Sequence, residues 1–191
     1  SNPPEVAEEV LADGCSDLSS MARPFLADPY FIRKAEQGRS DEINTCIGCN
    51  QACLDHTFSG KITSCLVNPR ACNETELKFV RTGASKRIAV VGAGPAGLSF
   101  STAAAERGHQ VTLFEAADDV GGQFNIAKKV PGKEEFYETL RYFRNHIKAT
   151  GVNAKFNTRV TVEDLVKGGF DEIVLATGVV PRTPPIEGVD H

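Results

Sequence analysis

The stretch Lys86-Arg-Ile-Ala-Val-Val-Gly92-Ala-Gly94-Pro-Ala-Gly97 decides the fold of this chain. Residues 88–91 form a short apolar run that predicts a buried strand, and a helix is expected after the glycines. Gly92 permits a tight turn, Gly94 lets the backbone approach a pyrophosphate at the helix N-terminus, and Gly97 lets helix and strand pack closely. Strand, turn and helix together predict a dinucleotide-binding fingerprint.

The chain beyond this turn continues as alternating strands and helices. We expect helices over 95–107 and 134–149, and strands over 111–115, 152–156 and 173–176. Such alternation predicts a parallel sheet with right-handed crossovers. Residues 86–191 are therefore predicted to form a Rossmann-like α/β domain.

Glu115 ends the second expected strand, where a carboxylate can accept both hydroxyl groups of an adenine ribose. A ribose 2′-phosphate would repel that carboxylate, so this half-site favours FAD or NAD over NADP. Residues 120–123 (Val-Gly-Gly-Gln) and 176–178 (Ala-Thr-Gly) resemble segments of two-dinucleotide-fold flavoproteins, which favours FAD over NAD. The alternative is a glycine-rich turn without a ligand.

A group of cysteines upstream of the fingerprint has the spacing of metal ligands. The four are Cys46, Cys49, Cys53 and Cys65. Four thiolates suit tetrahedral zinc or a cubane iron–sulfur cluster, and three close ligands with one distant ligand are more typical of a 4Fe-4S site. Zinc and free buried thiols remain alternatives. Cys15 and Cys72 fall outside the spacing and are predicted to serve in packing.

The N-terminal block is too small to fold around its own sheet. We expect a helix over 4–11, a strand over 15–21, and a second helix that opens at Asp28-Pro29 and ends before Gly38. A single strand cannot bury a sheet face, so residues 1–40 are predicted to be the end of a larger domain. The predicted division is 1–40, a cysteine segment over 41–77, a linker over 78–85, and the nucleotide domain over 86–191.

Composition excludes several broad classes of protein. The chain has 191 residues, 41% of them hydrophobic, and a net charge of −4. It has a composition that allows a packed core, no apolar run of about 18 residues, and no basic excess to attract nucleic acid. We expect no nucleic-acid or membrane partner. The polar N-terminus and the clustered cysteines favour a reducing, cytoplasmic location.

Longer motifs resemble one known family. They are Thr45-Cys46-Ile-Gly-Cys49-Asn-Gln51-Ala-Cys53, Cys65-Leu-Val-Asn-Pro69-Arg-Ala-Cys72, Gly121-Gly-Gln-Phe-Asn-Ile-Ala-Lys and Pro131-Gly-Lys-Glu-Glu-Phe-Tyr-Glu-Thr-Leu140. Together they resemble bacterial NADPH-dependent 2,4-dienoyl-CoA reductase. The resemblance covers essentially the whole chain.

The resemblance implies a TIM barrel of the old yellow enzyme type that binds FMN and the dienoyl-CoA, followed by a cluster segment and by FAD and NADPH domains. Electrons would run from NADPH through FAD, the 4Fe-4S cluster and FMN to the substrate, in the β-oxidation of unsaturated fatty acids. Residues 19–29 resemble the last barrel strand and its loop. By this matching, Ala22 and Arg23 would bind the FMN phosphate.

The same matching assigns the remaining cofactor residues. Cys46, Cys49, Cys53 and Cys65 would hold the cluster. The positions expected along FAD, with those of the glycine-rich turn, are Gln51, Gly92, Gly94, Ala96, Gly97, Glu115, Gly122, Gln123, Lys133 and Val160.

The chain departs from the family in completeness. Most of the barrel, the family's catalytic tyrosine and histidine, and a second glycine fingerprint for NADPH are missing. We therefore expect an internal fragment that carries no catalytic residue and is inactive alone, and the sequence predicts no oligomeric state. The alternatives are a related barrel flavoenzyme, such as a trimethylamine dehydrogenase or bile-acid enoate reductase, and a non-catalytic zinc plus nucleotide-binding module.

Overall fold

The computed structural model describes residues 3–180 and 182–188. Its centre is a parallel sheet of four strands in the order β3-β2-β1-β4. The strands are β1 (Arg87–Val91), β2 (Gln110–Phe114), β3 (Asn153–Lys155) and β4 (Glu172–Leu175). Val90 lies opposite Leu113 on one side and Val174 on the other. The predicted α/β fold with a parallel sheet is confirmed, and each expected strand of the nucleotide domain ends within one residue of its predicted end.

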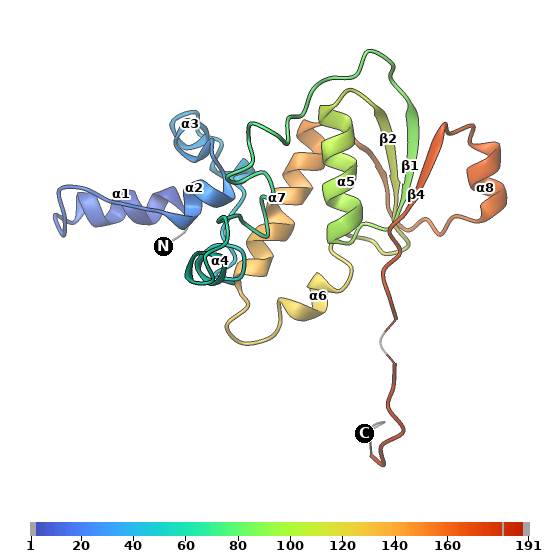
Figure 1. The fold of residues 1–191 in the computed structure, drawn as a ribbon. Coiled ribbons are helices and arrows are strands. Elements are labelled where there is room, and N and C mark those ends of the chain that lie inside the picture. Colours follow the sequence, from blue (N-terminus) through green and yellow to red (C-terminus); the bar gives the residue numbers. More distant parts are fainter. Residues whose placement is uncertain (1–2, 181, 189–191) are drawn as a thin grey trace.

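Two helices cover one face of this sheet (Figure 1). They are α5 (Pro95–Glu106) and α7 (Glu135–Ala149). Leu98 of α5 and Leu140 of α7 are almost fully buried with Leu113 of β2 in the main core. Burial of this apolar stripe is what holds both helices on the sheet.

The opposite face carries a smaller apolar cluster. Side chains alternate along a strand, so Ala89 points away from the face that buries Val90. It packs with Phe114 and with Leu165 of α8 (Val162–Lys167). Helix α8 was not predicted from the sequence. A capping box fixes its start, in which Thr161 Oγ1 accepts from the Asp164 backbone N–H at 3.2 Å.

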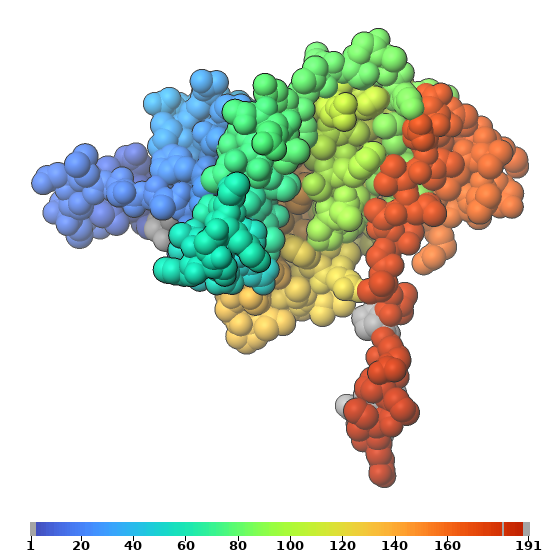
Figure 2. All heavy atoms as spheres, viewed as in Figure 1, coloured from blue at the N-terminus to red at the C-terminus, as the bar shows by residue number. Residues whose placement is uncertain are grey.

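The N-terminal part is built from short helices and connecting loops. These are α1 (Pro4–Ala12), α2 (Arg23–Ala27), α3 (Phe31–Glu36), the 3-10 turn η1 (Ser40–Glu42) and α4 (Leu54–Phe58). The short α6 (Phe124–Ala127) lies further along, before α7. Figure 2 shows the N-terminal part beside the nucleotide domain and the C-terminal segment projecting away from it.

One local prediction for this part is wrong, and one helix begins later than expected. Residues 15–21 form no strand: Leu18 is 84% exposed, and within the described residues no strand lies beside it to complete a hydrogen-bonded ladder. The helix expected from Asp28-Pro29 begins at Phe31, although the Asp28 carboxylate accepts from the Tyr30 backbone N–H at 3.0 Å in the turn before it. The same carboxylate also accepts hydrogen bonds from Lys34 Nζ and from the Asn44 backbone N–H.

The connection over 78–86 forms neither helix nor strand. Within residues 3–180 and 182–188, no helix combines the length and the apolar character that crossing a membrane requires.

Candidate functional site

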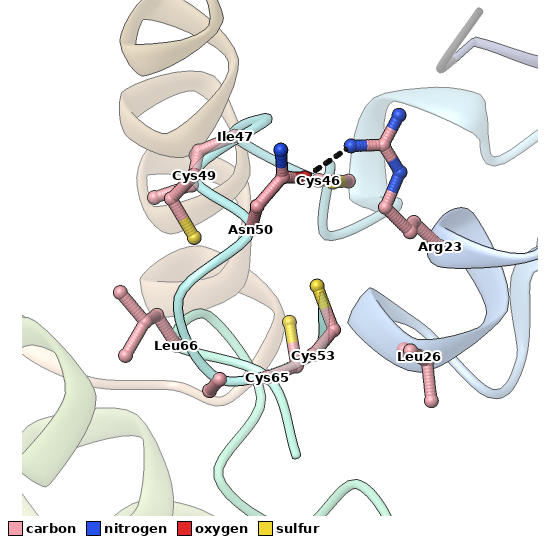
Figure 3. A pocket seen from close by; sticks show the side chains of 10 residues that line it. Arg23, Leu26, Cys46, Ile47, Cys49, Asn50, Cys53, Cys65 and Leu66 are labelled. Carbon is pink, nitrogen blue, oxygen red and sulfur yellow. Dashed lines mark hydrogen bonds between the residues drawn. The ribbon is translucent and has the colours of Figure 1, made fainter. Parts of the chain in front are cut away.

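The four clustered cysteines line a single pocket (Figure 3). Cys46, Cys49 and Cys53 come from the loop before α4 and the start of that helix, and Cys65 comes from the loop that follows it. The other lining residues are Arg23, Leu26, Ile47, Asn50, Ala52 and Leu66. The structure thus brings together all four predicted metal ligands, whereas Cys15 and Cys72 are exposed and lie outside the pocket.

The cysteine loop is shaped by two residues in left-handed backbone conformations. Gly48 has φ +65° and Asn50 has φ +60°, a region that glycine and asparagine tolerate better than most residues. The Gly48 backbone N–H donates to Cys46 Sγ at 3.4 Å. Asn50 Oδ1 accepts from Arg23 Nη1 at 2.6 Å, which ties the loop to the first turn of α2.

Asparagine side chains hold the distant cysteine next to the other three. Asn44 Nδ2 donates to the Val67 carbonyl at 2.7 Å, and Asn68 Nδ2 donates to the Leu26 carbonyl at 2.8 Å. Val67 and Asn68, which follow Cys65 closely in the sequence, are therefore hydrogen-bonded to the residues before Cys46 and to α2.

The pocket raises the proton affinity of one thiol. Burial raises the pKa of Cys65, the N–H groups of Val67 and Asn68 lower it, and the nearby Cys46 and Cys49 raise it further.

The chemistry of these thiols tests which metal group they suit. Tetrahedral zinc takes four thiolates at a Zn–S distance near 2.3 Å, and a 4Fe-4S cluster also takes four cysteine thiolates. All four cysteines line the same pocket, so the residues present fit either group.

The glycine-rich turn has the geometry that its sequence predicts. Gly92 has φ +105°, and a Cβ there would overlap the Ala176 carbonyl oxygen. A Cβ on Gly97 would overlap the Gly92 carbonyl oxygen, whereas one on Gly94 would meet open space. Gly92 and Gly97 are thus required by the fold, and Gly94 leaves the helix N-terminus open to a ligand.

Glu115 lies against the same turn, bonded to backbone. Its Oε2 accepts from the Ala93 N–H at 2.7 Å and its Oε1 accepts from the Ala117 N–H at 2.9 Å. The carboxylate is placed at the turn as expected, and its contact with a ribose stays a prediction.

The second glycine segment touches the first. Gly122 has φ +50°, and a Cβ on it would lie 3.3 Å from Gly94 Cα. Gln123 Nε2 donates to the Val179 carbonyl at 2.7 Å, which joins this segment to the chain after β4. The structure therefore gathers Gly94, Gly122 and Gln123 at one end of the sheet.

The other predicted cofactor residues are more scattered. Ala96 is exposed in the first turn of α5, and Gln51 is exposed in the cysteine loop. Lys133 is exposed, with Nζ 5.9 Å from the centre of the Phe136 ring. Val160 packs against the smaller apolar cluster on the opposite face of the sheet. Ala22 is exposed at the N-cap of α2. Their roles stay predictions.

The sequence did not indicate the residues that join the cysteine segment to its neighbours on either side. Arg141 on α7 donates hydrogen bonds to the segment just before Cys46. The buried Asp28 accepts from Lys34 of α3 and from the Asn44 N–H of the same segment. Arg141 directly follows the motif over 131–140 without a predicted role, and Asp28 was predicted only to cap a helix.

Residues 86–191 match a family model described as pyridine nucleotide-disulphide oxidoreductase. The chain belongs to this family. A metal reductase of Desulforamulus reducens is 44% identical over 98% of this chain and 29% of its own length. The similarity therefore extends through the cysteine segment as well as the family domain.

Solved structures agree with this assignment. A 2-naphthoyl-CoA reductase in complex with 2-naphthoyl-CoA has a TM-score of 0.93 and 40% identity, over 99% of this chain and 29% of that chain. Histamine dehydrogenase from Rhizobium sp. 4-9 has a TM-score of 0.84 and 34% identity, over 94% of this chain and 27% of that chain. The chain spans less than a third of these relatives. Dienoyl-CoA reduction stays a prediction.

Proposed function

We propose that this chain is the electron-relay part of an NADPH-dependent flavin oxidoreductase, with FAD at the glycine-rich turn and a 4Fe-4S cluster in the cysteine pocket. The observation that carries the proposal is that all four cysteines line one pocket. Their spacing in the sequence, three close ligands and one distant ligand, favours a cluster over the zinc alternative.

Each cofactor has residues in this chain suited to hold it. Cys46, Cys49, Cys53 and Cys65 would ligate the cluster, and the open N-terminus of α5 at Gly94 would receive the FAD pyrophosphate. When bound, a cluster exchanges single electrons while FAD exchanges one or two, so the pair can divide a two-electron reduction into single steps. FMN and NADPH would bind largely to other parts of the protein, with Ala22 and Arg23 contributing to the FMN phosphate site.

The proposed substrate is a conjugated acyl-CoA thioester, with 2,4-dienoyl-CoA as the first candidate. Two observations support this class. The sequence motifs resemble the dienoyl-CoA reductase family, and the structural relative with 40% identity is named for reduction of another CoA thioester, 2-naphthoyl-CoA.

A second candidate is amine oxidation. Histamine dehydrogenase is 34% identical to this chain, and dimethylamine dehydrogenase of Hyphomicrobium sp. is 31% identical over 98% of it. In that function the same relay would carry electrons away from the substrate. The direction of electron flow therefore separates the two candidates.

The cofactor proposal is tested by anaerobic purification of the full-length protein. We expect brown visible absorption, iron and acid-labile sulfide in a ratio near one to one, and extractable FAD. A colourless protein that contains zinc would overturn it in favour of the zinc module. Turnover of NADPH with 2,4-decadienoyl-CoA, against histamine or dimethylamine with an artificial acceptor, then decides the substrate class.

A further inference from the structure

Arg141 connects the cysteine segment to the nucleotide domain through a set of directed hydrogen bonds. Its side chain lies near the middle of α7 and is 28% exposed. The partners of its guanidinium are Glu138 Oε2 (2.7 Å), the Ser40 carbonyl (3.3 Å), the Asp41 carbonyl, the Ile43 carbonyl (3.0 Å) and Thr45 Oγ1 (3.1 Å). Four of these five acceptors belong to residues 40–45, which lead directly into Cys46.

The helix that carries Arg141 is fixed in the core of the nucleotide domain. Leu140 is 1% exposed and Ile147 is 4% exposed, and both pack in the main apolar cluster with the sheet. One turn beyond Arg141, Asn145 Nδ2 also donates to the Asp41 carbonyl, at 2.9 Å. The same helix therefore buries one face against the sheet and presents hydrogen-bond donors to the cysteine segment.

We propose that Arg141 is a positioning residue that sets the place of the cysteine pocket relative to the nucleotide-binding sheet. The inference rests on the proposed function, because its consequence is the rate at which electrons pass between FAD and the cluster. Thr45 is bonded to Arg141 and is the residue before Cys46, so a displacement of residues 43–45 moves a cluster ligand. Electron transfer slows steeply with separation, so the place of this segment would affect the transfer rate.

The chemistry of the side chain explains why it is an arginine. A guanidinium offers five N–H donors in one plane, whereas a lysine ammonium is a compact charge with three donors. Only the planar fork can bond Ile43, Thr45 and Glu138 together. Substitution by lysine keeps the charge and loses that geometry.

The experiment compares Arg141→Lys with Arg144→Lys in the full-length, flavin- and iron-loaded protein. Arg144 lies on the same helix and bonds Asp119, within the nucleotide domain, so it is a matched control for loss of an arginine from α7. The first readout is amide hydrogen exchange of residues 40–49, which needs no turnover. The second is the rate of electron transfer from flavin to iron after mixing with NADPH.

We expect faster exchange of residues 40–49 in Arg141→Lys alone. We also expect slower electron transfer in this variant alone, since the rate falls steeply as the two centres separate. The midpoint potentials and the iron content should stay unchanged, which separates a change of position from a change of cluster. Arg141→Gln serves as a second variant with the same expectation.

The outcomes separate this inference from the proposed function. Wild-type protein without iron overturns the proposed function itself. Wild-type protein that contains iron and flavin, with Arg141→Lys transferring electrons and exchanging amides like the wild type, overturns the positioning role alone. An equal effect in Arg144→Lys also overturns it, because the change would then reflect the helix as a whole.

Discussion

The nucleotide domain and the cysteine segment are held together by different forces. In the nucleotide domain, helices pack on a parallel sheet over a mainly apolar core, in which Val90 and Leu113 are completely buried. In the cysteine segment no strand forms within residues 41–77, and the buried residues include Asn44 and Thr45 beside Ile43. Directed hydrogen bonds from asparagine, lysine and arginine side chains replace the apolar core.

This difference determines what each region can tolerate. In a domain stabilised by burial, a substitution lowers the free energy of unfolding in proportion to the apolar contacts that it removes. A loop region stabilised by specific hydrogen bonds can instead shift once one donor is lost. A bound metal group would stabilise the cysteine segment, since small irregular segments with little apolar core usually need a metal or another cross-link. The following changes test this contrast, from the largest expected effect to the smallest.

Cys46→Ser should remove the iron and leave the nucleotide domain folded. Loss of one of four ligands in a pocket without spare donors is expected to abolish cluster assembly. Iron and sulfide analysis measures the first effect, and thermal unfolding of the FAD-binding part measures the second. Cys72→Ser is the matched control, because Cys72 is exposed and lies outside the pocket. Full iron content in Cys46→Ser would contradict the assignment of this ligand.

Gly97→Ala should destabilise the nucleotide domain, by roughly 4 kcal/mol as for other severe backbone overlaps. The added Cβ would overlap the Gly92 carbonyl oxygen, and neither backbone segment can move without breaking the turn. Gly94→Ala is the matched control. Its Cβ meets open space, so stability should be unchanged while FAD affinity falls, because the methyl group occupies the approach to the helix N-terminus. Denaturant unfolding and flavin titration separate the two, and equal stability of both variants would refute the argument.

Asp28→Asn should loosen the cysteine segment while the sheet stays intact. Asp28 is 2% exposed, and its carboxylate accepts from Lys34 Nζ at 2.6 Å and from the Asn44 N–H at 2.9 Å. Loss of one partner of a buried ion pair costs about 3 kcal/mol, because the other charge is left unpaired. Amide exchange should rise over residues 40–50 and not in β1 or β2. Glu42→Gln, which disrupts the more exposed pair with Arg39, serves as the comparison and should have a smaller effect.

The same contrast explains how much the sequence could predict. The glycine-rich turn was predictable because Gly92 and Gly97 hold positions that no side chain can occupy. Helix α7 was predictable from its one apolar stripe, in which Leu140 and Ile147 are buried as expected. The strand expected over 15–21 was wrong because a short stretch of sequence cannot show whether a partner strand lies beside it.

The cysteine ligands could be listed from their spacing, whereas the residues that place them could not. Arg141 sits on the less apolar side of α7, where a charged residue is usually solvated, and nothing in its neighbours indicates that it faces residues 40–45. The same holds for Asn44 and Asn68, whose side-chain amides each meet a backbone carbonyl from another part of the chain. Contacts of one side chain with distant backbone leave no periodic pattern to read.

The smallest expected effect is the acid sensitivity of an ion pair inside the nucleotide domain. The hydrogen bond from Arg144 lowers the pKa of Asp119, although partial burial opposes it. As the pH falls, the unfolded chain binds the proton first, near its ordinary pKa of about 3.9, so the pair stabilises the fold above that pH and the contribution is lost as the pH falls through the lower folded pKa. Both side chains are more than a third exposed, so solvent screening limits the contribution to less than about 1 kcal/mol. Asp119→Asn should remove this part of the acid dependence of unfolding and barely change stability at neutral pH. A loss at neutral pH as large as that of Asp28→Asn would contradict the contrast, since it would mean that polar pairs matter as much beside an apolar core as they do in the segment without one.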